Sequence, residues 1–341
     1  MPQKKTCVIL VNYNSWVDTV ECLESLFKLK ESVEIVVVDN ASTDDSIQSI
    51  RNWAQGEKVI TTSLHSELTR PPIAKPLVYK EYVEGERSVS QISDNHFTLL
   101  ISNRNDGFSS GNNLGIKFSV SHFDPKYFWL LNNDTVVKSN TLSKLIDFHE
   151  QSPKNIGVLG STILYYDQPE IVQCYGGAVY NKWLGKSSLV GEGSDIKDKG
   201  IDAFNELSFV SGASMFVSSK YIKDVGLLGE EYFLYFEELD WIYRGKQFGY
   251  EIAFVPESIV YHKGGQSTGS ENNSTGNSLL SDFYYTRNKI IFTKKHLGLL
   301  HLISIYLSFV LISMNRLLKG QWNRIPLLLS GLINPKKEIH R

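Results

Sequence analysis

The chain of 341 residues carries its most chemically capable side chains in short polar segments that follow apolar runs. Asn132, Asn133 and Asp134 come directly after the run FWLL at 128–131. A carboxylate oxygen is a preferred ligand of divalent cations, and the two amides can hydrogen-bond ribose or phosphate. Asn and Asp are equally common in a β-turn that ends a strand. The motif alone therefore predicts either a turn or a site for a metal and a diphosphate.

Three further carboxylates, Glu237, Glu238 and Asp240, follow the aromatic run 232–236. If a helix begins here, Glu237 and Asp240 are three residues apart and share a face, while Glu238 points elsewhere. Clustered carboxylates raise one another's proton affinity, as a general base requires. An acidic helix N-terminus, favoured by the helix dipole, is the other interpretation.

Two more segments could bind a ligand. His262 lies in YHKGG after a predicted strand, and an imidazole can join a manganese or magnesium site in the company of oxygen donors. The run 106–115 holds three glycines and two adjacent asparagines, and as a loop it would let the backbone approach a ligand. That run matches neither a P-loop nor a GxGxxG turn, so an ordinary flexible loop is the alternative.

The elements that must position these side chains begin with two apolar, β-branched runs. The runs 6–11 (TCVILV) and 33–38 (VEIVVV) predict buried strands, and the apolar spacing over 16–29 predicts an amphipathic helix between them, with Ser15 at its N-cap. This order is a parallel βαβ unit. Ligands of open α/β sheets lie beyond the carboxyl ends of the strands, which makes the segments VNYN and DNASTD candidate binding loops.

The rest of the chain continues the α/β pattern. The predicted strands are 97–101, 128–131, 157–164, 209–217 and 250–255, and the predicted helices are 45–53 and 237–248. Residues 61–96 are polar and without a sustained period, so we expect a surface insertion or a flexible loop there. The chain is predicted to form an α/β domain with a mostly parallel central sheet over 1–270 and a C-terminal helical segment over 271–341.

Composition narrows the class of protein. The chain is 42% hydrophobic and has a formal net charge of −2, which gives no reason to expect a nucleic-acid partner. The three cysteines lie far apart without a CxxC pair, which argues against a disulfide framework and favours a reducing cytoplasm. We expect no export, because no apolar stretch of signal-peptide length precedes the first strand.

The segment 297–314 differs from the rest, with 18 residues and no charge except on His301. This length is at the lower limit for crossing a bilayer, and basic residues flank the segment on both sides. The pattern predicts peripheral contact with the inner face of a cell membrane. A buried core helix and a homodimer interface are the alternatives.

In chain order the segments VNYN, VVVDNASTD, NDGFSSGNN, LLNNDT, SGASMFV, YFLYFEELDW and YHKGG resemble the glycosyltransferase family 2 enzymes, which have the GT-A fold. The likeness is closest to the rhamnosyltransferase-like branch that builds bacterial cell-surface polysaccharides, and it covers about 6–266. It implies inverting transfer of a sugar, such as rhamnose, from a dTDP- or UDP-sugar to a hydroxyl of a glycan or lipid-linked acceptor, with Mg²⁺ or Mn²⁺ as cofactor.

The resemblance also implies roles for individual residues. Asp39 is expected to contact the base, Asp134 and His262 the metal, and Asn132 replaces the first acid of the family's DxD motif. Glu238 is expected to be the catalytic base, with Glu237 and Asp240 as alternatives. The full set of implied nucleotide-sugar-binding residues is Val11, Asn12, Tyr13, Asp39, Asn40, Gly107, Phe108, Asn112, Asn113, Asn132 and Asn133.

Two other functions would use parts of the same pattern. A sugar nucleotidyltransferase also needs an α/β nucleotide domain and a metal, but it should carry a Gly-rich, basic triphosphate loop after the first strand, and VNYNSWVD lacks one. A non-catalytic nucleotide-sugar-binding protein would bind the donor and form no product.

Overall fold

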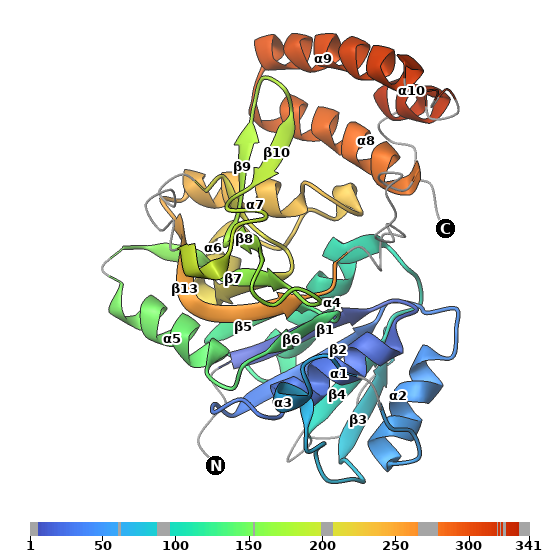
Figure 1. Cartoon of the computed structure of the whole chain (residues 1–341), viewed down its shortest axis with the longest axis vertical. Helices are drawn as coiled ribbons and strands as arrows, with labels where there is room; N and C mark the ends of the chain where they lie inside the picture. The colour runs from blue at the N-terminus through green and yellow to red at the C-terminus, as the bar shows by residue number, and fades with distance from the viewer. Residues whose placement is uncertain are drawn as a thin grey trace.

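The computed structural model describes residues 6–60, 63–86, 96–152, 154–198, 207–264, 279–318, 320, 322 and 325–333. A large sheet runs through the molecule with helices on both faces, and a small sheet and a C-terminal helical layer stand above it (Figure 1).

The large sheet has ten strands, and the first five in its spatial order are mutually parallel. In spatial order its strands are β3 (Tyr79–Val83), β4 (Phe97–Ile101), β2 (Val33–Asp39), β1 (Thr6–Asn12), β5 (Tyr127–Asn132), β12 (Ser214–Ser218), β7 (Ile156–Tyr165), β13 (Glu251–His262) and β6 (Thr135–Val137), with β8 (Val172–Tyr175) paired to β7. The small sheet consists of β10 (Lys186–Leu189), β9 (Gly177–Asn181) and β11 (Phe209–Val210).

The helices form two layers around the large sheet and a third layer at the C-terminus. On one face lie α1 (Trp16–Leu26), α2 (Ser46–Gln55), α3 (Ser66–Thr69) and α5 (Thr141–Gln151). On the other face lie α4 (Gly107–His122), α6 (Ser219–Val225) and α7 (Glu237–Gln247). The C-terminal layer holds α8 (Leu279–His296), α9 (Leu299–Leu318) and α10 (Ile325–Ile333), and the short 3₁₀ helices are η1 (Ile196–Asp198) and η3 (Glu230–Tyr232).

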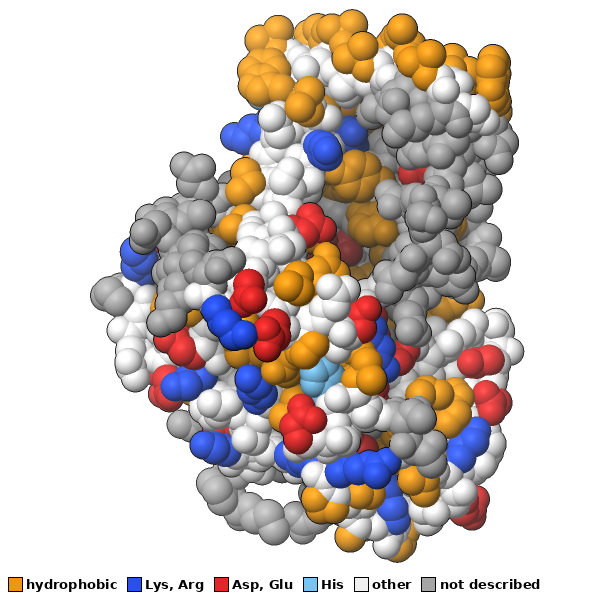
Figure 2. All heavy atoms as spheres, viewed as in Figure 1, with side chains coloured by type: hydrophobic (Ala, Val, Ile, Leu, Met, Phe, Trp, Pro, Cys, Tyr) orange, Lys and Arg blue, Asp and Glu red, His pale blue; other side chains and the backbone are white. Residues whose placement is uncertain are grey.

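The C-terminal layer is joined to the rest of the molecule through α8 and the β9–β10 hairpin. Phe292 of α8 is fully buried and packs edge-on against Tyr180 of β9, at 5.4 Å between ring centroids. The predicted domain boundary near 270 lies outside the described residues. Buried side chains of α8 nevertheless pack in one cluster with residues that precede this boundary. The outer surface of α9 and α10 is hydrophobic (Figure 2). Within the described residues, we find no helix that combines the length and hydropathy needed to cross a bilayer.

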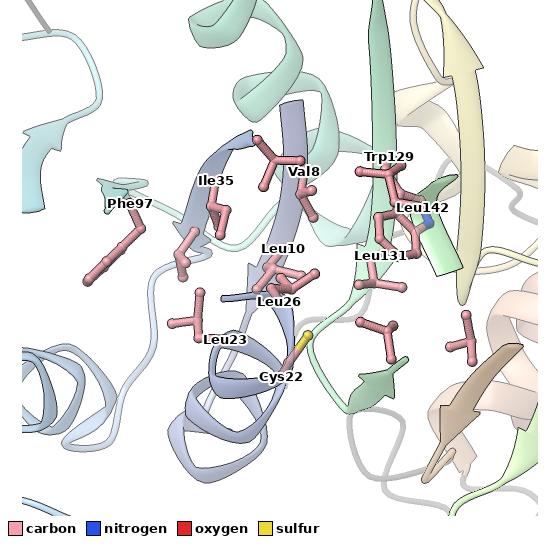
Figure 3. Close-up of a cluster of buried hydrophobic side chains, with 14 of the residues drawn as sticks. Val8, Leu10, Cys22, Leu23, Leu26, Ile35, Phe97, Trp129, Leu131 and Leu142 are labelled. Carbon is pink, nitrogen blue, oxygen red and sulfur yellow. The ribbon is translucent and has the colours of Figure 1, made fainter. Parts of the chain in front are cut away.

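The apolar runs of the sequence are explained by strands that are covered on both faces. In β1, Val8 and Leu10 face α1, while Cys7 and Ile9 face α4, and all four side chains are fully buried. Figure 3 shows the first side of this core, where Val8 and Leu10 lie among side chains of α1, β2 and β5. A strand buried on both faces needs an unbroken apolar run, not an alternating pattern.

The parallel register brings the ends of four strands to one edge of the sheet. Asn12 of β1 pairs with Asp39 of β2, and Val11 pairs with Asn132 of β5. Strand β4 is parallel to β2, with Ile101 opposite Asp39. The predicted βαβ unit and the predicted strands at 97–101 and 128–131 are confirmed.

The sequence predicts a loop over 106–115, but in the structure this run forms the N-terminal half of α4. Gly111 and Gly115 are four residues apart and lie against β1. A Cβ at Gly111 would be 2.8 Å from a Val11 methyl carbon, and one at Gly115 would be 2.7 Å from Cγ2 of Ile9. Glycine disfavours helices, which makes the run look flexible, but here it permits the close approach of helix to sheet.

Two other expectations also differ from the structure. Part of the polar stretch 61–96 forms α3 and the edge strand β3, whose side chains are charged or half-buried and so give no apolar run. The single strand expected over 209–217 is two strands, β11 and β12, which belong to different sheets.

Replacing Gly115 by Leu should destabilise the protein, because the added side chain would enter the gap between α4 and β1. The expected loss is about 1–3 kcal/mol from overpacking, which exceeds the gain in helix propensity of at most about 1 kcal/mol. The measurement is the midpoint of thermal or urea unfolding. Ser121→Leu at an exposed position of the same helix is the control, and equal midpoints for the two variants would contradict this packing role.

Candidate active site

A cavity of about 830 Å³ opens at the edge of the sheet where the parallel strands end. Its walls come from the strand ends, the start of α4, the loop before β12 and the segment before α7. The lining residues are Val11, Tyr13, Asn40, Ala41, Thr43, Arg104, Asn105, Asp106, Gly107, Phe108, Asn132, Asn133, Asp134, Ser211, Gly212, Ala213, Phe233, Leu234, Tyr235, Glu237, Glu238, His262 and Leu280.

Asp134 follows β5 directly and is almost completely buried. Its Oδ2 accepts a hydrogen bond from the backbone N–H of Gly264 at 3.2 Å. Its Oδ1 lies 3.2 Å from Nε2 of His262 but has no hydrogen-bond partner in the described residues. Burial raises the pKa of Asp134, yet protonated His262, a backbone hydrogen bond and Lys263 together lower that pKa by more, so the net shift is downward. The carboxylate is therefore held ionised inside the protein.

His262 ends β13 and meets Asp134 because β13 pairs with β6, which starts just after Asp134. The Nδ1 of His262 lies 2.7 Å from Oε1 of Gln173, which can only accept, so Nδ1 carries the hydrogen. In the neutral ring Nε2 then presents a lone pair toward Asp134 and the side-chain amide of Asn132, 3.3 Å away.

These two groups fit a divalent cation. Oδ1 of Asp134 is a buried oxygen with an unused lone pair, and Nε2 of His262 is an oriented nitrogen beside it. Among the described residues we find no cluster of three or more His, Cys, Asp or Glu side chains that could hold a metal. A cation bound here would therefore need further ligands from water or from a phosphate.

The acid pair Glu237 and Glu238 begins α7 and reaches the cavity from another wall. Burial raises the pKa of Glu238 to about 7. Burial also raises the pKa of Glu237 well above its usual value, and the charge of Glu238 adds to this effect. Oε2 of Glu237 is buried without a hydrogen-bond partner in the described residues. A carboxyl group with a pKa near neutrality can accept a proton during a reaction.

The segment before these acids has a strained backbone. Phe233, Tyr235 and Phe236 have φ values of 62°, 68° and 77°, which bulky residues rarely adopt and which cost about 1–3 kcal/mol each. On the side of α4, the N–H of Phe108 donates to the carbonyl of Phe233 at 2.8 Å. A Cβ at Gly107 would be 2.2 Å from that carbonyl, so only glycine allows this approach.

Gly212 is the most informative site residue that the sequence analysis did not single out. It lies in the loop before β12, and a Cβ at this position would be 2.5 Å from Oε1 of Glu238. Its backbone N–H stabilises the charged form of Glu238. The segment SGASMFV marked this loop in the sequence, but no residue type in it indicated contact with an acid.

Several expected binding residues do not line the cavity. Asn12 and Asp39 are fully buried and bond each other, from Nδ2 to Oδ2 at 2.7 Å, and Asp39 also accepts from Ser42. Asn112 donates to a carbonyl of its own helix, and Asn113 holds the backbone of 228. These side chains hold the segments that form the cavity wall but do not line the cavity themselves. By contrast Val11, Tyr13, Asn40, Gly107, Phe108, Asn132 and Asn133 do line the cavity.

Asp240, the third candidate acid, lies outside the cavity. Its carboxylate accepts from Arg244 at 2.8 Å and from His296 at 2.7 Å, and Lys295 is 2.8 Å away. Burial raises the pKa of Asp240, but these three partners together hold it well below its usual range. Such a carboxylate is a poor proton acceptor, so the structure favours Glu238 and Glu237 over Asp240 as a base.

Comparison with known families decides the class. The family described as Glycosyl transferase family 2 matches residues 7–68, and the one described as Glycosyltransferase like family 2 matches residues 77–276. The chain belongs to glycosyltransferase-like family 2. The matched ranges of this family member contain each predicted binding loop and the acid pair Glu237 and Glu238.

Individual relatives are distant. The family member is 22% identical over 247 residues to the low-salt glycan biosynthesis hexosyltransferase Agl10 of Haloferax volcanii, with 70% of this chain and 61% of that protein covered. It therefore spans less than two thirds of the length of this relative.

Solved structures show the same fold. The mannosyltransferase PcManGT from Pyrobaculum calidifontis, in complex with GDP-Man and Mn²⁺, superposes with a TM-score of 0.52 at 11% identity, over 98% of this chain and 87% of that one. S. aureus TarS 1–349 in complex with UDP-GlcNAc superposes with a TM-score of 0.55 at 15% identity, over 98% and 82%. The family member thus has the GT-A fold that its motifs predicted.

The buried acids should make stability depend on pH. Because folding raises the pKa of Glu237, the unfolded chain loses this proton first as pH rises above about 4.5, and the folded protein is destabilised from there up to the raised pKa. Glu237→Gln should therefore stabilise the protein at about pH 8, by about 1 kcal/mol or more, and the gain should vanish near pH 4. The measurement is the unfolding midpoint at several pH values.

Glu251→Gln is the matched control, because Glu251 is exposed and pairs with Lys154 at the surface. Its effect should be small at every pH. A Glu237→Gln variant that is no more stable than the wild type at high pH would contradict the burial argument.

Proposed function

We propose that this protein is an inverting glycosyltransferase that moves a hexose from a nucleoside-diphosphate sugar to an acceptor hydroxyl. The observation that carries the proposal is that one cavity contains both the Asp134–His262 pair and the acid Glu238, whose pKa is raised toward neutrality. Sugar transfer needs both functions, stabilisation of a leaving diphosphate and removal of a proton from the attacking hydroxyl. Family membership and the GT-A fold support this assignment.

The nucleotide is expected to lie between the ends of β1 and β2 and the start of α4. Val11, Tyr13 and Asn40 offer an apolar wall, an aromatic ring and an amide to the nucleoside. Asn132 can donate from its side-chain amide to the diphosphate, whereas the amide of Asn133 already donates to Thr19 and to the carbonyl of Ser15. A divalent ion, Mg²⁺ or Mn²⁺, supplies neutralisation of the leaving diphosphate when bound, and Asp134 and His262 would hold it.

In the reaction Glu238 takes the proton of the acceptor hydroxyl, while the oxygen of that hydroxyl bonds to the anomeric carbon of the donor. The bond from that carbon to the diphosphate oxygen breaks, the diphosphate leaves with the electron pair, and the configuration inverts. Gly212 provides the space for Oε1 of Glu238, since any side chain at 212 would collide with this oxygen. Glu237, still protonated, keeps a second negative charge out of the site.

For the donor we propose a dTDP- or UDP-hexose, with rhamnose as the first sugar to test, and for the acceptor a glycan or lipid-linked glycan of a cell-surface polysaccharide. The motif pattern supports the rhamnosyltransferase-like branch. The relatives carry other names, a hexosyltransferase and a mannosyltransferase, which support a hexose in general.

A sugar nucleotidyltransferase is less well supported by the cavity. Only one basic side chain besides His262 lines it among the described residues, Arg104, which is exposed and pairs with Asp106. A triphosphate substrate would need more positive charge. A non-catalytic sugar-nucleotide-binding protein would not need an acid held near neutral pKa.

The test is a transfer assay with purified protein, Mn²⁺ or Mg²⁺ and a panel of nucleoside-diphosphate hexoses, paired with calorimetric donor binding. Glu238→Gln should bind the donor as the wild type does but lose transfer by about 100-fold or more. Asp134→Ala should lose the part of donor binding that depends on the cation. Wild-type kcat should fall as pH drops through about 7, because the base is then protonated.

Asp147→Ala, an exposed acid on α5, is the control and should change neither donor binding nor transfer. Undiminished transfer by both Glu238→Gln and Asp134→Ala would overturn the site assignment. Donor binding by the wild type without any product would favour the non-catalytic alternative.

We further propose that α9 lies on the inner surface of a cell membrane. Its outward side chains include Leu299, Leu307 and Leu318, which are 70%, 64% and 87% exposed. Figure 2 shows hydrophobic side chains gathered over α9 and α10 at the top of the molecule. The sequence 297–333 contains no Asp or Glu and three Lys or Arg residues, which suits an anionic lipid surface.

Sedimentation with phosphatidylglycerol-containing vesicles tests this contact. Leu307→Glu should weaken binding by about 10-fold or more, because it places a charge where an apolar side chain would be buried. Val120→Glu on α4 is the control, since Val120 is also exposed but lies on another helix. If Leu307→Glu instead converts a dimer to a monomer in solution without affecting the vesicles, α9 is a homodimer interface.

A further inference from the structure

One side chain of the C-terminal layer, Asn288 of α8, reaches the backbone of the acid-bearing segment. Asn288 is fully buried. Its Nδ2 lies 2.7 Å from the carbonyl oxygens of Tyr232 and Leu234 and 2.9 Å from that of Tyr235. An amide has two hydrogens, so these three carbonyls share two donors. Asn288 thus spans the segment just before Glu237.

The orientation of this amide is fixed by its neighbour. Nη1 of Arg287 lies 2.7 Å from Oδ1 of Asn288 and 2.8 Å from the carbonyl oxygen of Glu231. A guanidinium can only donate, so the atom facing Arg287 must be the oxygen of the amide. The NH₂ group must then face the carbonyls of the segment.

The segment needs such donors because its backbone is irregular. Phe233, Tyr235 and Phe236 are left-handed, so their peptide groups cannot follow a helix or a sheet. Buried carbonyls without a regular partner require donors from side chains. Among the described residues, Asn288 donates to more of these carbonyls than any other side chain does.

Other contacts hold the same segment against α8 and α4. The ring of Phe233 stacks on Tyr284 of α8, with 4.7 Å between centroids and 16° between planes. On the opposite side the N–H of Phe108 donates to the carbonyl of Phe233. Leu280, at the start of α8, lines the cavity itself. Helix α8 begins after residue 276, where the family match ends.

We propose that Asn288 is a positioning residue, which holds the left-handed segment 232–236 and thereby fixes Glu238 at the wall of the cavity beside Gly212. The proposal rests on the proposed function, in which Glu238 is the base. It makes α8 part of the catalytic apparatus and not only a support for α9. Asn288 itself touches neither substrate nor reacting atoms.

The consequence for the reaction follows from connectivity. The segment leads without interruption into Glu237 and Glu238, so a shift of its backbone moves both acids. Without the donors of Asn288, the Glu238 carboxylate would leave its confined place and become more hydrated. Its pKa would then fall toward that of an ordinary carboxyl group. The part of the cavity proposed to bind the nucleotide, between the ends of β1 and β2 and the start of α4, would keep its structure.

The experiment compares full-length Asn288→Ala and Asn288→Asp with the wild type. The Asp variant keeps the volume and lacks the two donors. We expect kcat to fall about 10- to 100-fold, donor affinity by calorimetry to stay within about twofold, and the acid limb of the kcat–pH profile to move to lower pH. Hydrogen exchange of peptides covering 232–240 should become faster, while that of β1 and β2 should not change.

The control is Ile290→Val, which alters another fully buried side chain of α8, one that packs on Ile305 of α9. It should leave kcat and the pH profile unchanged. Wild-type kcat and pH profile in Asn288→Ala, or equal changes in Ile290→Val, would overturn the proposal. If both Asn288 variants fail to fold, Asn288 is a structural residue and the proposal is wrong.

The outcome can be separated from a failure of the proposed function. If Glu238 is not the base, Glu238→Gln retains transfer whatever Asn288 does. If only the positioning role is wrong, Glu238→Gln is inactive while the Asn288 variants transfer sugar normally.

Discussion

The parallel register of β4, β2, β1 and β5 is the constraint on which the rest of the structure depends. It places the ends of four strands at one edge, so that Val11, Asn40 and Asn132 face a common cavity. The register in turn requires close packing of α4 on β1, which Gly111 and Gly115 permit. A shift of one residue would turn the buried side chains of these strands to the wrong face. The packing of the core therefore determines where the site lies.

The same cavity contains groups that are unfavourable for stability. Two neighbouring acids are buried together, Oδ1 of Asp134 has no hydrogen-bond partner among the described residues, and three aromatic residues have left-handed backbones. Each of these features destabilises the fold, and the surrounding sheet must offset them. Another cavity, lined in part by Trp53 and Glu24, lacks such features, because Glu24 is paired with Lys75 and with the indole N–H of Trp53.

The C-terminal layer has two sides with different roles. Its inner side, α8, contacts the strained segment before Glu237 and contributes Leu280 to the cavity. Its outer side, α9, exposes apolar side chains and is tied to the β9–β10 hairpin through Ser304, which donates to the carbonyl of Trp183 at 2.7 Å. The exposed apolar surface of α9, which we propose to contact a membrane, is thus joined to the acids of the cavity through one short stack of helices.

The sequence by itself determined the βαβ unit, the next two parallel strands and the edge of the sheet where the site lies. Unbroken apolar runs such as 6–11 and 33–38 specify strands buried on both faces, and polar residues directly after them specify loops at the carboxyl ends. These signals are local, because they depend on the period and on neighbours in the chain. For this reason the order of the residues is enough to locate Asp134 and the pair at 237–238 as candidates.

Only the tertiary structure decided which of those candidates share the cavity. Asp240 lies outside the cavity because Lys295 and His296, more than 50 residues away in sequence, pair with its carboxylate. Asn113 does not line the cavity because its side chain bonds the backbone of 228. Gly212 lines the cavity, where the lack of a side chain lets Glu238 approach. Asn288 donates to the carbonyl of Tyr232, 56 residues away in sequence, in the segment that precedes the acids. Contacts of this kind depend on how distant elements pack, and the period of a sequence specifies which face of an element is buried but not what it meets.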